Sequence, residues 1–134
     1  MNPEQIAKTS EHSHQAAFFC WVNQQQDYPH LKFAHAIPNG GLRGKVQAAR
    51  LKAEGVRAGV PDVFVPYPIH LGTDNARAGL YIEFKKPGIE KRKDGGLSKN
   101  QIEWRGYLQS MKYEHMVVYS YKEAIDGVLE YLTK

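Results

Sequence analysis

The sequence predicts a single α/β domain in which helices flank a β-sheet. Its 134 residues are the length of one domain, and a composition with 42% hydrophobic and 24% charged residues is that of an ordinary globular protein. Helical periodicity alternates with β-rich runs in the order helix, strand, helix, two strands, helix, strand, helix. We therefore expect one domain over residues 1–134, with a core from about residue 10 to residue 132.

The first half of the chain predicts a helix, a strand and a second helix. Apolar residues recur at helical spacing over residues 10–26 and stop before Pro29. Alternating apolar residues over 31–37 predict a half-buried strand. Residues 45–54 are rich in Ala, Leu, Arg and Lys, which favour helices, and Gly55 suits the position just after a helix.

The second half predicts two strands, a loop, a helix, a strand and a closing helix. β-Branched and aromatic residues indicate strands at 62–65 and 80–85, and the basic, proline- and glycine-containing stretch 86–99 indicates a loop. Ser98 and Gln101 have the spacing of a capping box, which predicts that a helix begins there. The last two elements are a strand at 115–119 and a helix at 121–132.

Composition and charge narrow the possible functions. No apolar run is long enough to cross a membrane and residues 1–8 lack the pattern of a signal peptide, so we expect no membrane partner and a cytoplasmic location. The one cysteine, Cys20, can form neither an internal disulfide nor a Cys-rich zinc site. The formal net charge of +4 suits a polyanionic partner, although many proteins with such a charge bind none.

The strongest chemical signal is the run of residues 81–85, Tyr-Ile-Glu-Phe-Lys. Side chains alternate along a strand, so Glu83 and Lys85 lie side by side on one face. Asp62 stands at the start of the preceding strand, and if the two strands are neighbours it shares a cation with Glu83. Paired carboxylates suit Mg²⁺ or Mn²⁺ better than zinc, and such an ion can activate water to attack a phosphodiester. A solvated strand face with an ordinary ion pair explains the spacing equally well.

The residues around this run resemble a known nuclease family. Pro61-Asp62 followed by Glu83-Phe84-Lys85 is similar to the PD-(D/E)XK nuclease signature. Four longer segments closely resemble standalone VRR-NUC (virus-type replication-repair nuclease) domains of phages and prophages: 38–43, 48–52, 55–62 and 98–104. The resemblance spans roughly residues 11–132 and implies a restriction-endonuclease-like fold, a mixed sheet flanked by helices.

The resemblance also implies the members of a metal site. It assigns Asp62, Glu83 and the backbone carbonyl of Phe84 as ligands of Mg²⁺ or Mn²⁺, and Lys85 as the catalytic lysine. Glu11 occupies the position of an acidic residue that often completes the site from the first helix.

Two further candidates, Glu11 and Gln101, also have local explanations. Helical spacing independently places Glu11 on the same inward stripe as Phe18, although a frayed first turn would leave it interacting only with the helix dipole. Gln101 either orients Lys85 or merely closes the capping box with Ser98.

Basic residues flank the predicted site on both sides. Phosphate contacts need positive charge without a unique spacing, so these side chains predict a surface for the DNA backbone, although any one of them can be a solvated surface residue. The predicted DNA-binding residues are Arg43, Lys45, Arg50, Arg57, Lys86, Lys91, Arg92 and Lys93.

The resemblance therefore implies a metal-dependent DNA endonuclease that acts as a homodimer on branched DNA such as four-way (Holliday) junctions, in the host cytoplasm if a phage encodes it. Two alternatives remain. One is a nicking or flap endonuclease of the same fold without junction preference. The other is a non-catalytic DNA-binding accessory protein, against which the intact Asp62, Glu83 and Lys85 argue.

Three weaker patterns receive no functional assignment. Residues 40–45 resemble a phosphate-binding loop, but their spacing is wrong and the required Ser or Thr is missing. Structural or surface roles explain His12, His14 and Cys20 best. We expect His35, on the apolar face of its strand, to be a core histidine.

Overall fold

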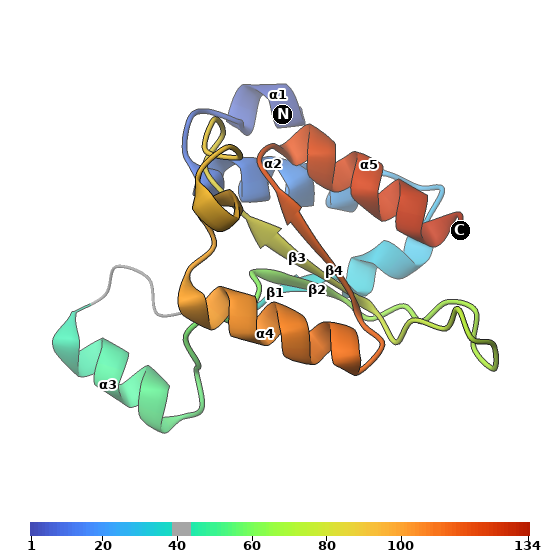
Figure 1. Ribbon diagram of the computed structural model, residues 1–134. Coiled ribbons are helices and arrows are strands. Elements are labelled where there is room, and N and C mark those ends of the chain that lie inside the picture. The colour runs from blue at the N-terminus through green and yellow to red at the C-terminus, as the bar shows by residue number, and fades with distance from the viewer. Residues whose placement is uncertain (39–43) are drawn as a thin grey trace.

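The computed structural model describes residues 1–38 and 44–134, and a four-stranded sheet lies at its centre (Figure 1). The strands run in the spatial order β1-β2-β3-β4. Antiparallel pairing joins β1 to β2 and β2 to β3, whereas β3 and β4 are parallel. The sheet is therefore mixed, as predicted. Its strands are β1 (His35–Ala36), β2 (Val63–Val65), β3 (Leu80–Phe84) and β4 (Glu114–Val118).

Helices cover both faces of the sheet (Figure 1). The chain contains α1 (Pro3–Ile6), α2 (Glu11–Gln24), α3 (Lys45–Ala53), α4 (Lys99–Ser110), α5 (Tyr121–Leu132) and the 3₁₀ helices η1 (Pro29–Phe33) and η2 (Lys93–Gly96). Phe84 packs against Phe18 of α2, with ring centroids 5.8 Å apart, and Glu83 contacts Gln101 of α4. Because neighbouring residues of a strand point to opposite faces, α2 and α4 lie on opposite sides of β3.

The hydrophobic core lies on the side of the sheet that α2 and α5 cover. Phe18 of α2, Val128 of α5 and the β3 residues Leu80, Ile82 and Phe84 have no exposed surface. Full burial of an aliphatic or aromatic side chain of this size stabilises the fold by about 1.5–3 kcal/mol. This packing holds β3 in place, and with it the backbone that carries Glu83.

The predicted strand at 31–37 is wrong over most of its length. The 3₁₀ helix η1 occupies its first half, and only β1 is extended. Pro29 stands at the start of η1, where its fixed φ favours a helical turn. Leu31 is buried, but Phe33 and His35 are exposed, so His35 is not a core histidine.

The other predicted elements are confirmed with small shifts at their ends. The stretch predicted as a loop after β3 includes η2, and the short helix α1 was not predicted. Asn2 begins α1 with a capping box that includes Gln5. Among the described residues, no helix has the length and apolarity needed to cross a membrane.

Candidate functional site

The ends of four elements meet at one end of the sheet. Glu11 is the first residue of α2, Asp62 immediately precedes β2, Glu83 lies near the end of β3 and Gln101 is in the first turn of α4. Since β2 and β3 are antiparallel, with Val63 opposite Ile82, the start of β2 lies beside the end of β3. The sheet topology thus brings together residues that are far apart in the sequence.

Three carboxylates from these elements form a tight cluster. Glu11, Asp62 and Glu83 each offer an oxygen atom, and these atoms all lie within 4.8 Å of one another. Asp62 is 7% exposed and Glu83 is 2% exposed. Like charges at this separation with little solvent repel one another strongly, so the cluster favours a proton or a cation.

Backbone hydrogen bonds fix Asp62 in the cluster. Its Oδ2 accepts a hydrogen bond from the N–H of Phe84 at 2.8 Å, and its carbonyl oxygen accepts one from the N–H of Ile37 at 2.7 Å. On the β4 side of β3, the N–H of Lys85 donates to the carbonyl oxygen of Val118 at 2.8 Å. The backbone that follows Glu83 is therefore anchored both to Asp62 and to Val118.

The surroundings of Glu83 strongly perturb its pKa. Burial, followed by the neighbouring charge of Asp62 and a hydrogen bond to it, raises the pKa of Glu83 to about 10. The ammonium of Lys85 acts in the opposite direction, and Glu11 adds to the rise. In the described part of the chain, no donor reaches the buried Oε1 of Glu83. These carboxylates fit a hard divalent cation, which would satisfy that oxygen and relieve the repulsion.

Gln101 makes two contacts, of which the sequence predicted one. Its side-chain oxygen accepts a hydrogen bond from the N–H of Ser98 at 2.8 Å, which closes the predicted capping box. Its Nε2 donates to Oε2 of Glu83 at 3.3 Å. The amide therefore caps α4 and also orients a carboxylate of the cluster, where the sequence suggested Lys85 as the other partner.

Glu11 reaches the cluster from α2, which lies on the opposite side of β3 from α4. It begins α2 directly after Ser10, whose side chain caps the helix, and it is partly buried. Phe18, on the same helical stripe, is fully buried, as is nearly all of Val22. The inward orientation predicted for Glu11 is confirmed, although the residue does lie in the first helical turn.

The predicted DNA-binding residues that the structure describes lie on α3, on the turn after it and on the stretch that follows β3. All of them are exposed: Lys45, Arg50, Arg57, Lys86, Lys91, Arg92 and Lys93. Arg43 lies outside the described residues. Figure 1 shows α3 and the segment that follows β3 on the side of the sheet where β3 ends.

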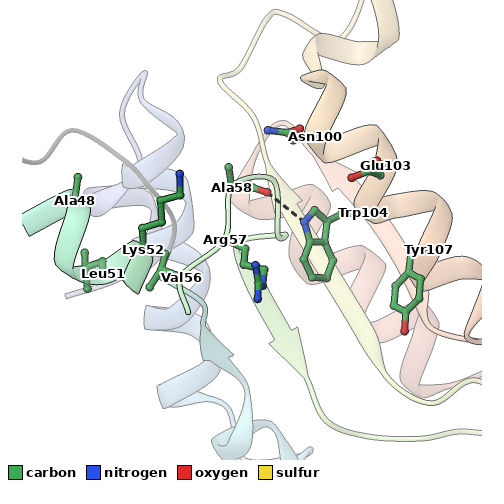
Figure 2. A pocket seen from close by; sticks show the side chains of 10 residues that line it. All are labelled: Ala48, Leu51, Lys52, Val56, Arg57, Ala58, Asn100, Glu103, Trp104 and Tyr107. Atoms are coloured by element: carbon green, nitrogen blue, oxygen red, sulfur yellow. Dashed lines mark hydrogen bonds between the residues drawn. The ribbon is translucent and has the colours of Figure 1, made fainter. Parts of the chain in front are cut away.

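The sequence did not predict a groove that the structure shows. It has a volume of about 790 Å³ and runs between α3 and α4 (Figure 2). Trp104 and Tyr107 contribute aromatic side chains from α4, and Leu51 and Val56 contribute aliphatic ones. Apolar periodicity predicts only that an aromatic residue faces other parts of the protein. It cannot show whether those parts pack tightly against the residue or leave a groove.

The three histidine and cysteine residues set aside above have no place in the cluster. His14 is buried and links two segments: its Nδ1 accepts a hydrogen bond from the N–H of Tyr121 at 2.9 Å, and its Nε2 lies 2.8 Å from the carbonyl oxygen of Lys8. His12 is exposed, and Cys20 is partly buried with its sulfur near the backbone of Met1. Their structural or surface roles are confirmed.

Comparison with known proteins agrees with this architecture. The family model of the VRR-NUC domain matches residues 3–122. A solved structure described as a VRR_NUC domain protein superimposes with a TM-score of 0.69 at 25% sequence identity, covering 92% of this chain and 88% of that chain. No curated protein matches the chain. With its mixed sheet and acidic cluster, the chain belongs to the VRR-NUC domain family and is a nuclease of the PD-(D/E)XK type.

Proposed function

We propose that this nuclease hydrolyses phosphodiester bonds in branched DNA, including four-way junctions, with Mg²⁺ or Mn²⁺ held by Glu11, Asp62 and Glu83. The observation that carries the proposal is the group of three carboxylates within 4.8 Å of one another, next to Lys85. A structural ion pair would need only Glu83 and Lys85. Two further carboxylates add repulsion that only a bound cation or proton relieves.

Oxygen ligands from four residues would hold the ion: the three carboxylates and the backbone carbonyl of Phe84. Hard oxygen donors suit Mg²⁺ and Mn²⁺, and the donor-free Oε1 of Glu83 fits such an ion. The bound ion would supply Lewis-acid stabilisation of the phosphate and a water molecule of lowered pKa.

The protein's own side chains would orient and neutralise the reacting groups. Lys85 directly follows β3, and its ammonium interacts electrostatically with Glu83, so its Nζ would donate to a phosphate oxygen as negative charge develops there. Gln101 is a positioning residue, because its Nε2 restrains the rotamer of Glu83. The exposed basic residues around the site would bind the backbone of the DNA.

Branched DNA and a homodimer are supported by the resemblance to standalone VRR-NUC domains. A twofold dimer would present two sites related by symmetry, which suits paired cuts in a symmetric junction. The exposed basic residues of α3 and of the segment that follows β3 supply positive charge on two separate segments for the backbone of the DNA. A nicking or flap endonuclease without junction preference would use the same site.

A cleavage panel tests the proposal. Purified protein is incubated with labelled linear, flapped, splayed and four-way DNAs in Mg²⁺, Mn²⁺ or EDTA, together with the Asp62→Asn variant. The exposed Asp126 of α5 provides the matched control Asp126→Asn. We expect metal-dependent cutting, fastest on four-way DNA, by the wild type and the control, and nearly none by Asp62→Asn.

Each other outcome contradicts a stated part of the proposal. Cleavage by a folded Asp62→Asn protein would exclude the metal site. Equal rates on linear and four-way DNA would exclude junction preference, and binding without cutting in either metal would indicate an accessory protein. A monomer of the DNA-free protein in sedimentation at the concentration of the assay would exclude the homodimer.

A further inference from the structure

The groove between α3 and α4 is built from two different kinds of side chain. Trp104 and Tyr107 lie on α4, with ring centroids 6.4 Å apart at nearly a right angle, and Tyr107 is 58% exposed. Lys52 lies on α3 and Arg57 on the segment that follows it, and both line the groove (Figure 2). The groove thus presents aromatic surface on one side and positive charge on the other.

The groove is joined to the carboxylate cluster through the backbone. The indole N–H of Trp104 donates to the carbonyl oxygen of Ala58 at 3.2 Å (Figure 2). Gly59, with a φ of +93°, approaches α4 so closely that an added Cβ would lie 2.7 Å from the Cβ of Asn100. This segment leads directly to Asp62, and Asn100 precedes Gln101. A ligand in the groove therefore lies against the same two segments that carry the site.

The charge around the groove favours a polyanion. From residue 44 to residue 58 the chain carries four basic side chains and one acidic side chain, Glu54. Among the described residues that line the groove, Glu103 is the one acidic residue. None of the residues of α3, all of which are described, is buried. A second copy docked here about a twofold axis would place this positive surface against itself, which opposes association.

We propose that this groove binds single-stranded DNA, with an unpaired base stacked on the exposed Tyr107 and contacting Trp104 at its edge, and the adjoining phosphates on Lys52 and Arg57. This inference rests on the proposed nuclease function and names the DNA feature that the enzyme engages beside its site. Aromatic side chains with neighbouring cations are the general means of holding single strands without reading their sequence. A continuous duplex keeps its bases stacked and offers none to the groove.

The test measures binding in EDTA, so that no DNA is cut. Fluorescence anisotropy follows a labelled oligothymidylate of about 12 nucleotides and a blunt duplex of the same length. Tyr107→Ala is the test variant, and Phe33→Ala removes the other strongly exposed aromatic side chain, 61% exposed, as the matched control. We expect Tyr107→Ala to weaken oligothymidylate binding about tenfold and duplex binding by less than about twofold, with no change for Phe33→Ala.

A second readout reports the position of the base. Of the two tryptophans, Trp21 packs beside the core, so a Trp21→Phe variant leaves Trp104 as the only indole. Oligothymidylate should quench the fluorescence of this variant, whereas the blunt duplex should not. Absence of quenching, or equal losses on both DNAs in Tyr107→Ala, would overturn the inference. So would conversion of a dimer to a monomer by Tyr107→Ala, which would make the groove an interface between copies.

The groove and the nuclease site fail independently in these experiments. Binding in EDTA requires no bound metal, so it can be measured on Asp62→Asn as well as on the wild type. If Tyr107→Ala binds oligothymidylate as well as the wild type does, the proposal of metal-dependent cleavage is not affected. Cleavage by Asp62→Asn would exclude the metal site but would not contradict base stacking in the groove, which the binding measurements test separately.

Discussion

Replacing Gln101 by alanine separates its two roles in the structure. The variant loses the amide that closes the capping box, worth about 1 kcal/mol of helix stability, and the hydrogen bond from Nε2 to Glu83. A hydrogen bond to a charged or partly charged group is worth about 1.5–3 kcal/mol at most, and the 3.3 Å distance places this one at the low end. We expect the free energy of unfolding to fall by about 2–3 kcal/mol.

The matched control is Ser98→Ala, which removes the other half of the same capping box. The side chain of Ser98 accepts a hydrogen bond from the N–H of Gln101 at 3.2 Å, and losing it also lowers the stability of the helix by about 1 kcal/mol. In this variant Gln101 can still contact Glu83. Both variants should therefore melt several degrees lower. Only Gln101→Ala should also lose activity, about tenfold in kcat, because the carboxylate of Glu83 is no longer oriented.

Two assays decide between these roles. Thermal melts give the stability of each variant, and cleavage of a labelled four-way DNA at saturating metal gives its turnover. The conservative variant Gln101→Glu keeps an acceptor for the cap but places a like charge against Glu83, so it should cleave no faster than Gln101→Ala. Equal turnover of Ser98→Ala and Gln101→Ala would refute the positioning role and leave Gln101 as a helix cap.

Three further predictions follow from the described contacts. Glu11→Gln should fold and bind DNA but cut slowly, with partial recovery at raised metal concentration; metal titrations that superimpose on the wild type would leave Glu11 without a role in the site. Neutralising Lys91, Arg92 and Lys93 together should weaken binding similarly for different DNA sequences and flatten its salt dependence, whereas a loss confined to one sequence would contradict backbone binding. Burial, and after it the charge of Arg105, lowers the pKa of His115 from 6.5 to about 4. As the pH falls from 6.5 to 4, the unfolded chain therefore binds a proton at His115 before the folded chain does, and the free energy of unfolding decreases. His115→Leu should lose this part of the pH dependence of the melting temperature, and an unchanged dependence would contradict it.

Local pattern was enough to predict most elements of the fold. Periodicity located α2, α4 and α5, and the capping box of Ser98 and Gln101 marked the start of α4. It failed at residues 31–37, where alternating apolar residues suggested a strand and the structure has η1 and a short β1. Alternation cannot distinguish a strand from a tight turn when a proline sets the first φ angle and only Leu31 reaches the core.

By itself the sequence determined the chemical types in the site: two carboxylates and a lysine on or beside β-rich runs, with a further carboxylate on an inward helical stripe. The tertiary structure decided that Asp62 and Glu83 are neighbours, because this depends on the antiparallel pairing of β2 with β3. It also decided that Gln101 contacts Glu83 and that α3 and α4 enclose a groove. The physical reason is range: propensity and periodicity report interactions along a few residues, whereas the cluster and the groove depend on how distant segments pack around a shared core.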